Sequence, residues 1–293
     1  MVMVLVALLG GLWAIRDPAF SVQVDVCRVE GVIGPVCSEF IVEAIHQAVA
    51  DSAVCLIIEL DTPGGLDTSM RDIIKELMVS EVPVVVYVSP SGSRAASAGV
   101  FVTLAAHVAA MAPGTNIGAA HPVAFGGGKM DSTMVEKITN DAAAYIITIA
   151  KKRGRNADWA EEAVRKSVSA TEKEALELGV TDLVCRDVPA LLDSLDGRRV
   201  SLPSGERVLQ TREAVVKEIS MGFRERVLSA ISNPNIAYIL MILGMYGLIF
   251  ELSHPGAYLP GVVGGICLIL AFFAFQTLSV NYAGVLLILF AAI

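Results

Sequence analysis

The feature that most constrains this fold is a long, almost uncharged stretch at the C-terminal end. Residues 227–293 contain no Lys or Arg and one acidic residue, Glu251. Within this stretch, the apolar runs 236–252 and 262–278 reach the lower length limit for helices that cross a bilayer. Residues 253–261 contain Pro and Gly and would join the two runs through a tight turn. We therefore expect a helical hairpin in a membrane, attached to a separate domain that carries most of the charge.

The chain divides into four parts. Residues 1–20 match the apolar core of a secretory signal peptide or N-terminal anchor. Residues 21–212 form one domain, 213–235 an amphipathic linker helix, and 236–293 transmembrane helices, the third of which is cut short by the end of the sequence. Large domains can follow a signal across a membrane whatever their charge. We therefore expect an integral, multi-pass membrane protein whose first domain is extracytoplasmic.

Composition narrows the choice of partners and cofactors. The net charge is −8, which argues against nucleic acid because phosphate binding needs concentrated Lys and Arg. The five cysteines lack metal-site spacing, so we expect no metal and no other cofactor. Cys27 and Cys37 are the two that could form a disulfide in an oxidising compartment.

Apolar strands alternate with helices along the first domain. The patterns predict strands at 21–29, 55–60, 84–88, 108–112 and 180–184 and a hairpin at 199–210. They predict helices at 39–50, around 70–77, at 100–106 and at 132–152, the last with a core stripe of Val135, Ile138, Ala142, Ile146 and Ile149. This alternation predicts an α/β fold with a parallel sheet, in which a functional site lies beyond the carboxyl ends of the strands.

Ser97 is the candidate nucleophile. It stands in a turn of small residues between a predicted strand and a predicted buried helix, a position that can present a reactive hydroxyl. The helix N-terminus also directs free N–H groups toward this position. A serine that only caps a buried helix would show the same local pattern, so the argument depends on the residues around it.

A second turn, Asp61-Thr62-Pro63-Gly64-Gly65, follows the neighbouring strand and opens on the same edge of the sheet. Two glycines after a strand leave backbone N–H groups accessible, so we expect the N–H groups of Gly65 and Ala98 to form an oxyanion hole. We expect Gly64, Ala119 and His121 to contact the substrate at this edge.

Serine needs a proton acceptor, and two residues qualify. His121 follows the strand at 108–112 at the same sheet edge, and Lys137 lies on the helix at 132–152. Lysine, with an ordinary pKa of about 10.4, acts as a base near neutral pH only where burial favours its neutral form. Spacing alone does not decide which of the two residues is the base.

Three glycines at residues 126–128, before this helix, predict a mobile loop.

The motifs as a set resemble those of the NfeD membrane serine proteases, relatives of signal peptide peptidase A and of the Clp protease fold. They are Asp61-Thr62-Pro63-Gly64-Gly65, Ala95-Ala96-Ser97-Ala98-Gly99, Met111-Ala112-Pro113-Gly114-Thr115-Asn116-Ile117-Gly118-Ala119, Lys137-Ile138-Thr139-Asn140 and the hydrophobic C-terminal block. The resemblance implies a Clp/crotonase-like, parallel-sheet protease domain followed by a transmembrane helical region. It also implies a Ser-Lys dyad in which Ser97 is the nucleophile and Lys137 the base. The N–H groups of Gly65 and Ala98 would form the oxyanion hole, and neither ATP nor a cofactor would be required.

The resemblance also implies partners. The family is associated with stomatin-type (SPFH) membrane proteins, and it cleaves hydrophobic segments of such proteins. The expected function is therefore a membrane-anchored serine endopeptidase that contacts lipid and forms a homo-oligomer, a dimer or larger. The alternative is a non-catalytic membrane partner that assembles with stomatin-type oligomers. Acyl-CoA chemistry uses a similar oxyanion hole but would not need Ser97. The resemblance also implies that the long family form ends in an OB-like domain, which we do not expect within these 293 residues.

Overall fold

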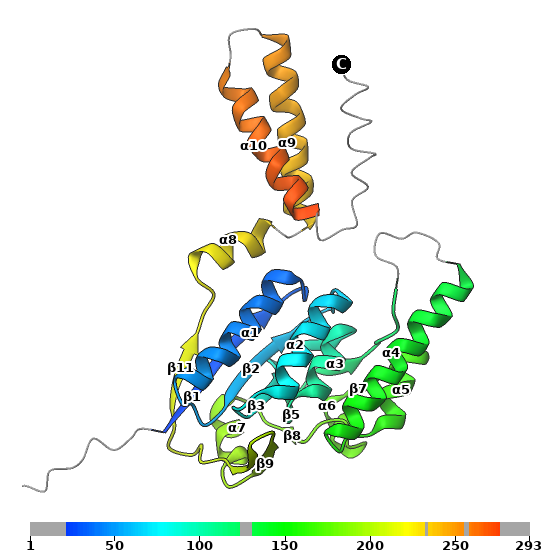
Figure 1. Ribbon diagram of the computed structural model, residues 1–293, viewed down its shortest axis with the longest axis vertical. Helices are drawn as coiled ribbons and strands as arrows, with labels where there is room; N and C mark the ends of the chain where they lie inside the picture. The colour runs from blue at the N-terminus through cyan, green and yellow to red at the C-terminus, as the bar shows by residue number, and fades with distance from the viewer. Residues whose placement is uncertain (1–21, 124–130, 232–233, 255–257, 276–293) are drawn as a thin grey trace, which may run out of the picture.

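The computed structural model describes residues 22–123, 131–231, 234–254 and 258–275 (Figure 1). The predictions for residues 1–20, for the glycines at 126–128 and for a third membrane segment lie outside these ranges. The described residues form an α/β domain, from which a pair of long helices extends (Figure 1).

A six-stranded sheet is the centre of the domain, and all its neighbouring strands run parallel, as predicted. Its strands in spatial order are β11 (Val215–Ile219), β1 (Gln23–Glu30), β2 (Leu56–Asp61), β3 (Val84–Val88), β5 (Val108–Met111) and β8 (Leu183–Val184). Every residue of β3 is buried, in keeping with its β-branched sequence and its place inside the sheet. The carboxyl ends of β2, β3 and β5 therefore meet at one edge.

Helices cover the two faces of the sheet unequally. One face packs against α1 (Pro35–Ala50), α2 (Asp67–Val79), α3 (Ala98–Ala105), α4 (Ser132–Lys152) and α5 (Ala157–Arg165). The other packs against α7 (Val188–Leu195) and the hairpin of β9 (Arg199–Leu202) and β10 (Gly205–Val208). All eight residues of α3 are buried, so this helix lies inside the domain and not on its surface.

A second, three-stranded sheet supports the turn that contains Ser97. It consists of β4 (Arg94–Ala96), β6 (Asn116–Gly118) and β7 (Ser169–Thr171), with β6 in the middle. A capping box of Thr171 and Glu174 begins α6 (Glu172–Glu177) next to β7. This small sheet ties the Ser97 turn to segments far along the chain.

The predicted linker helix from residue 213 is wrong in its first half. Val215–Ile219 is strand β11, which pairs in parallel with β1 at the edge of the main sheet, and only α8 (Phe223–Ile231) is helical. An edge strand with a distant partner overrides the local helical periodicity of this segment. The first domain therefore extends beyond residue 212.

Two smaller predictions also need correction. The helix expected at 39–50 begins at Pro35, the first helical position that proline favours. The core stripe of α4 begins only at Ala142, because Ile138 is 37% exposed and Val135 is only partly buried. The first turns of α4 extend beyond the main body of the domain (Figure 1).

The C-terminal helices α9 (Pro234–Ser253) and α10 (Tyr258–Phe275) pack side by side as a hairpin (Figure 1). A Cβ on Gly247 would lie 2.9 Å from the Cα of Gly264, so small residues bring the two backbones close together. Among the described residues, Asn235–Ser253 is the one helix long and apolar enough to cross a membrane, and the apolar helix Tyr258–Ala274 is shorter.

Cys27 and Cys37 are buried free thiols, so the disulfide that we considered is not formed.

Candidate active site

Ser97 occupies a strained position at the start of α3. It is the N-cap residue and has φ 51° and ψ −116°, a conformation that residues other than glycine rarely adopt. Its N–H donates to the Gly118 carbonyl at 3.2 Å, and its carbonyl accepts from the Val100 N–H at 3.0 Å. Hydrogen bonds on both sides thus keep the hydroxyl-bearing residue in a sharp turn.

Gly64 lies directly against this turn. A Cβ on Gly64 would come within 2.5 Å of the Ser97 Cβ and 3.0 Å of its Oγ, and Gly64 has φ +118°. The Gly64 N–H also donates to Thr62 Oγ1 at 3.0 Å, which fixes the turn internally. We predicted that Gly64 contacts the substrate, but Gly64 does not line the cavity that Ser97 lines, and the structure shows instead its close approach to Ser97.

The N–H of Gly65 points away from the neighbouring segment of the chain, which contains Ile33. Ile33 donates to the Gly64 carbonyl at 2.9 Å, and Leu66 donates to the Ile33 carbonyl at 2.9 Å. Since the bonds of this parallel bridge use the groups on either side of Gly65, its own N–H points to the opposite side. Ala98 is the first residue of α3, where the N–H has no partner within the helix.

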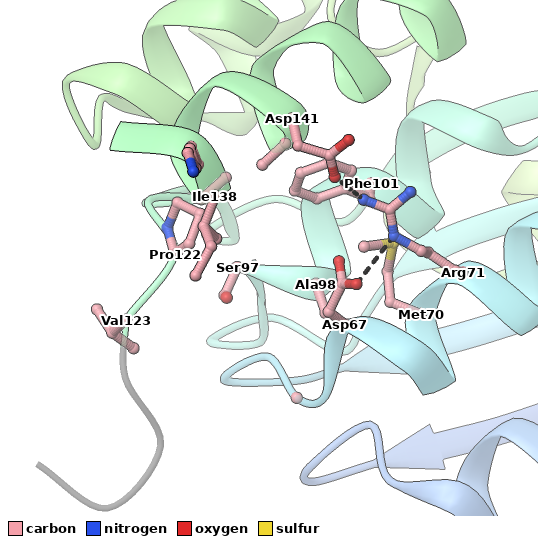
Figure 2. A pocket seen from close by; sticks show the side chains of 14 residues that line it. Asp67, Met70, Arg71, Ser97, Ala98, Phe101, Pro122, Val123, Ile138 and Asp141 are labelled. Carbon is pink, nitrogen blue, oxygen red and sulfur yellow. Dashed lines mark hydrogen bonds and ion pairs between the residues drawn. The ribbon is translucent and has the colours of Figure 1, made fainter. Parts of the chain in front are cut away.

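These groups open into a cavity of about 650 Å³ (Figure 2). Ser97, Ala98 and Gly65 line it together with Lys137 from α4. Apolar side chains also contribute, and Figure 2 shows Ile138 and Pro122 on one side of Ser97 and Met70 on the other. The residues that line the cavity are Gly65, Asp67, Met70, Arg71, Ser97, Ala98, Phe101, Ala120, Pro122, Val123, Lys137, Ile138, Asp141 and Ala142.

The two candidate bases are placed differently. Lys137 lines the cavity, whereas His121 does not, although its neighbours Ala120 and Pro122 do. The His121 Nδ1 lies 2.9 Å from the Val164 carbonyl in α5, so this nitrogen donates its proton there. The Nε2 of His121 remains a proton acceptor, but the ring is hydrogen-bonded to α5 and does not line the cavity.

Ala119, predicted to contact the substrate, also lies outside the cavity lining. It has φ +52°, and its N–H donates to the Val168 carbonyl at 2.9 Å. The adjacent residue Ala120 lines the cavity instead. In this segment, Ala120 and Pro122 therefore line the cavity, and the predicted residues Ala119 and His121 do not.

Sequence reasoning missed a charged cluster in the cavity wall. Arg71 Nε donates to Asp67 Oδ2 at 2.9 Å, and the guanidinium also bonds Asp141 of α4 (Figure 2). The guanidinium carbon lies 4.4 Å from the centre of the Tyr145 ring. Burial disfavours the charged guanidinium, but Asp67 and Asp141 outweigh it and the pKa of Arg71 is raised. The spacing of Asp67 and Arg71 in one helix was the only local signal of this cluster.

The described residues contain no group of three or more His, Cys, Asp or Glu placed to bind a metal ion. The chemistry that this cavity offers comes from a serine hydroxyl, backbone N–H groups, a lysine amine and one ion-pair cluster.

Fold and site together define a class: membrane-attached α/β domains in which a serine at a sharp turn opens into a cavity beyond a parallel sheet. The chain belongs to the NfeD family. Residues 23–188 match the family model of the NfeD1b N-terminal domain, and residues 235–293 match the NfeD integral membrane domain. The predicted family and fold class are confirmed, and the protein carries a C-terminal membrane domain.

Two curated relatives resemble most of this chain. The membrane-bound protease PH1510 of Pyrococcus horikoshii is 41% identical over 252 residues, which cover 84% of this chain and 57% of that protein. The membrane protein NfeD1b of Bacillus subtilis is 30% identical over 260 residues, covering 86% of this chain and 58% of that protein. The chain thus spans less than three fifths of either relative.

Solved structures resemble the first domain. A lysine-to-alanine variant of the 1510-N membrane-bound stomatin-specific protease, in complex with a substrate peptide, has a TM-score of 0.67 and 36% identity, and covers 72% of this chain and 98% of that one. The 1510-N membrane protease specific for a stomatin homolog from Pyrococcus horikoshii has a TM-score of 0.63 and 35% identity, covering 72% and 98%. A serine-to-alanine variant has a TM-score of 0.62 and 37% identity, covering 69% and 98%.

Proposed function

We propose that this chain is a membrane-anchored serine endopeptidase with a Ser97–Lys137 dyad that acts without ATP or a cofactor. The observation that carries the proposal is the shared cavity. Ser97, at a strained backbone position, lines one space together with Gly65, Ala98 and Lys137, which belong to separate segments of the chain. This is the set of groups that acyl transfer needs: a nucleophile, a base and donors for an oxyanion.

The groups act in sequence. Ser97 Oγ attacks the scissile carbonyl carbon while its proton passes to the neutral amine of Lys137. The carbonyl oxygen becomes an oxyanion, which accepts hydrogen bonds from the N–H groups of Gly65 and Ala98. The tetrahedral intermediate collapses, the C–N bond breaks, and Lys137 returns the proton to the leaving amine. Water then attacks the acyl-enzyme with Lys137 again as the base, which releases the acid and regenerates Ser97.

The cavity favours an apolar substrate. Met70, Phe101, Ile138 and Ala142 contribute its apolar wall. A hydrophobic peptide that fills it would exclude water from the reacting groups and favour the neutral form of an amine. The related 1510-N protease is specific for a stomatin homologue, so we propose a hydrophobic segment of a stomatin-type membrane protein as the substrate here.

We further propose that the protein is multi-pass, contacts lipid, assembles into a homo-oligomer and places residues 22–231 on the extracytoplasmic side. The adjacent helices α9 and α10 support a membrane hairpin. Protease protection of this domain in sealed vesicles would test the orientation.

The testing experiment compares cleavage of a stomatin-type hydrophobic peptide by the full chain and by Ser97→Ala, Lys137→Ala and His121→Ala. We expect Ser97→Ala and Lys137→Ala to lose at least about a thousand-fold in kcat, and His121→Ala to stay within about ten-fold of wild type. Loss with His121→Ala and not with Lys137→Ala would make His121 the base. If wild type cleaves nothing yet binds a stomatin-type oligomer, the alternative of a non-catalytic partner replaces the proposal.

A further inference from the structure

Lys137 shares its cavity with two acidic side chains. Asp67 from α2 and Asp141 from α4 both line the space that Lys137 lines. A carboxylate close to an ammonium stabilises the charged form of lysine, and a charged lysine cannot accept the proton of Ser97. A dyad in this cavity therefore needs something that keeps these carboxylates from pairing with Lys137.

Asp141 is the acid better placed to pair with Lys137, because both residues lie on α4. Lys137 and Asp141 are separated by one helical turn, so their side chains emerge on the same face of the helix. Tyr145 lies a further turn along this face and stacks on Phe101 of α3, with ring centroids 6.2 Å apart. This face of α4 is thus directed toward α2 and α3, the helices next to the oxyanion groups and the nucleophile.

Arg71 already occupies both carboxylates. It forms ion pairs with Asp67 and Asp141, and its own side chain is 28% exposed, less than either partner. One planar guanidinium bridges the two acids, with one donor to each, and so fixes their geometry more firmly than a single ammonium contact could. The acids are therefore oriented toward Arg71 in the free protein.

The other charged groups near Lys137 do not perform this task. Among the described residues, Glu136 is exposed on the neighbouring position of α4, and His121 contacts α5. From α5, Arg165 donates to Asn140 Oδ1 at 2.7 Å and pairs with Glu161. None of these side chains lines the cavity, so among the described residues of its wall Arg71 is the one basic residue besides Lys137, and it pairs with both acids.

We propose that Arg71 is a positioning residue that keeps Asp67 and Asp141 in ion pairs with itself, so that Lys137 stays unpaired and able to act as the base. The inference rests on the proposed Ser97–Lys137 function and deepens it. Bound apolar substrate excludes water and strengthens the competition for Lys137, since charge interactions grow as the surroundings become less polar. Arg71 therefore matters most in the enzyme–substrate complex.

The test is the pH profile of kcat, which reports the enzyme–substrate complex. Cleavage of a fluorogenic apolar peptide by the full chain in detergent micelles is to be measured between pH 6 and 10. With Arg71→Met we expect the pH of half-maximal kcat to rise by about one unit, so that kcat falls about ten-fold at pH 7.5 and recovers to within about two-fold at the high-pH plateau. Adding Asp141→Asn to Arg71→Met removes the competing acid on the same helix face as Lys137 and should restore most of the loss.

Arg165→Met is the matched control, because it removes another arginine contact to the same turn of α4 from outside the cavity. We expect it to leave the midpoint unchanged. A uniform fall in kcat at every pH after Arg71→Met, or a shift that Asp141→Asn does not reverse, would overturn the inference and make Arg71 a structural anchor. Should Arg71→Met fail to fold, Asp141→Lys provides a second variant that breaks the ion pair and removes the acid, and it should leave the midpoint unshifted or lower it.

Lys137→Ala separates the two proposals. If it abolishes cleavage while Arg71→Met causes no shift, only the role of Arg71 fails. If Lys137→Ala cleaves as wild type does, the dyad itself fails, and the inference fails with it.

Discussion

The two sides of the candidate site are built in different ways. Ser97 begins α3, a helix in which every residue is buried. Lys137 lies near the start of α4, where no residue from 132 to 141 is buried. One side of the cavity, which we call the nucleophile side (residues 62–65 and 94–106), is thus part of the core. The other, the base side (residues 132–141), is attached at the surface.

This difference follows what each side has to do. Donors for an oxyanion and a nucleophile must be in place before the reaction, because their geometry determines the stabilisation of the transition state. A base on a surface helix can be adjusted by ion pairs such as that of Arg71 and by the substrate itself. Stability should therefore depend on the nucleophile side, and substrate handling on the base side.

The largest expected effect on stability comes from an arginine that binds the nucleophile side from outside, at residues 104 and 106. Arg155 has a side chain that is 2% exposed and pairs with Asp182 at 2.6 Å. It also donates to the carbonyls of Leu104 and Ala106 at 2.8 Å, at the end of α3. Arg155→Met should lower the free energy of unfolding by about 3–5 kcal/mol, because it leaves a carboxylate and two carbonyls without their partner.

Denaturant unfolding of the full chain in detergent, followed by Trp fluorescence, measures this change. Arg71 of α2 is the counterpart that binds the base side, through Asp141, and Arg71→Met should cost less than about 1 kcal/mol, since its partners are exposed. Equal losses for the two arginines would remove the contrast between the two sides.

The next largest loss of stability is expected for Gly64→Ala. Its Cβ would lie 2.5 Å from the Ser97 Cβ, and its φ is +118°. We expect a loss of about 3 kcal/mol from strain and overpacking, and at least a hundred-fold loss of kcat because Ser97 is displaced. Gly92→Ala is the matched control: Gly92 has φ +93° but nothing within 4 Å of its Cβ position. It should cost about 1 kcal/mol and leave kcat unchanged; equal effects on kcat would refute the role of close approach.

Much of the nucleophile side could be predicted from the sequence. Strand β3 was predicted with the observed bounds, and Ser97 and Gly65 were placed at one sheet edge because parallel strands end there. Local patterns suffice where a buried strand leads directly into a turn. Strands β4, β6 and β7 escaped prediction since three-residue strands show no periodicity.

The base side and the domain edge were predicted less well, for a shared physical reason. The bounds of α4 were predicted correctly, but whether Ile138 is buried depends on what packs against it. The pairing of Arg71 with Asp141, and that of β11 with β1, joins residues far apart in the sequence. No local pattern specifies such partners.

His107, which directly follows the nucleophile side, should make the stability of the domain depend on pH. It lies between α3 and β5, and burial, with Arg153 and Arg155 nearby, lowers its pKa to about 3. Its Nδ1 accepts the Val84 N–H at 3.1 Å, a bond that protonation would break. The unfolded chain takes up this proton near pH 6.5, and the folded protein only near pH 3. The free energy of unfolding therefore has its full value above pH 6.5 and decreases as the pH falls, by about 2 kcal/mol at pH 5.

Unfolding curves at pH 7 and pH 5 for wild type and His107→Asn check this expectation. Asparagine can accept the same Val84 hydrogen bond but does not titrate. The variant should lose most of the pH dependence between these values. An unchanged pH dependence would show that other groups cause the acid sensitivity.

The smallest effect on stability, and the sharpest test of the contrast, is expected on the base side. Ile138 lines the cavity and is 37% exposed. Ile138→Ala should change the free energy of unfolding by less than about 0.5 kcal/mol because little surface is exchanged with the core. It should raise KM for an apolar peptide about three- to ten-fold and leave kcat within two-fold, because it removes binding surface and no reacting group.

Met134→Ala provides the control for Ile138→Ala. Met134 is one turn earlier on the same helix, is 51% exposed and does not line the cavity, so neither stability nor KM should change. A loss of more than about 1 kcal/mol in Ile138→Ala would mean that the start of α4 is packed in solution. The base side would then be part of the core, and Lys137 would be as firmly positioned as Ser97.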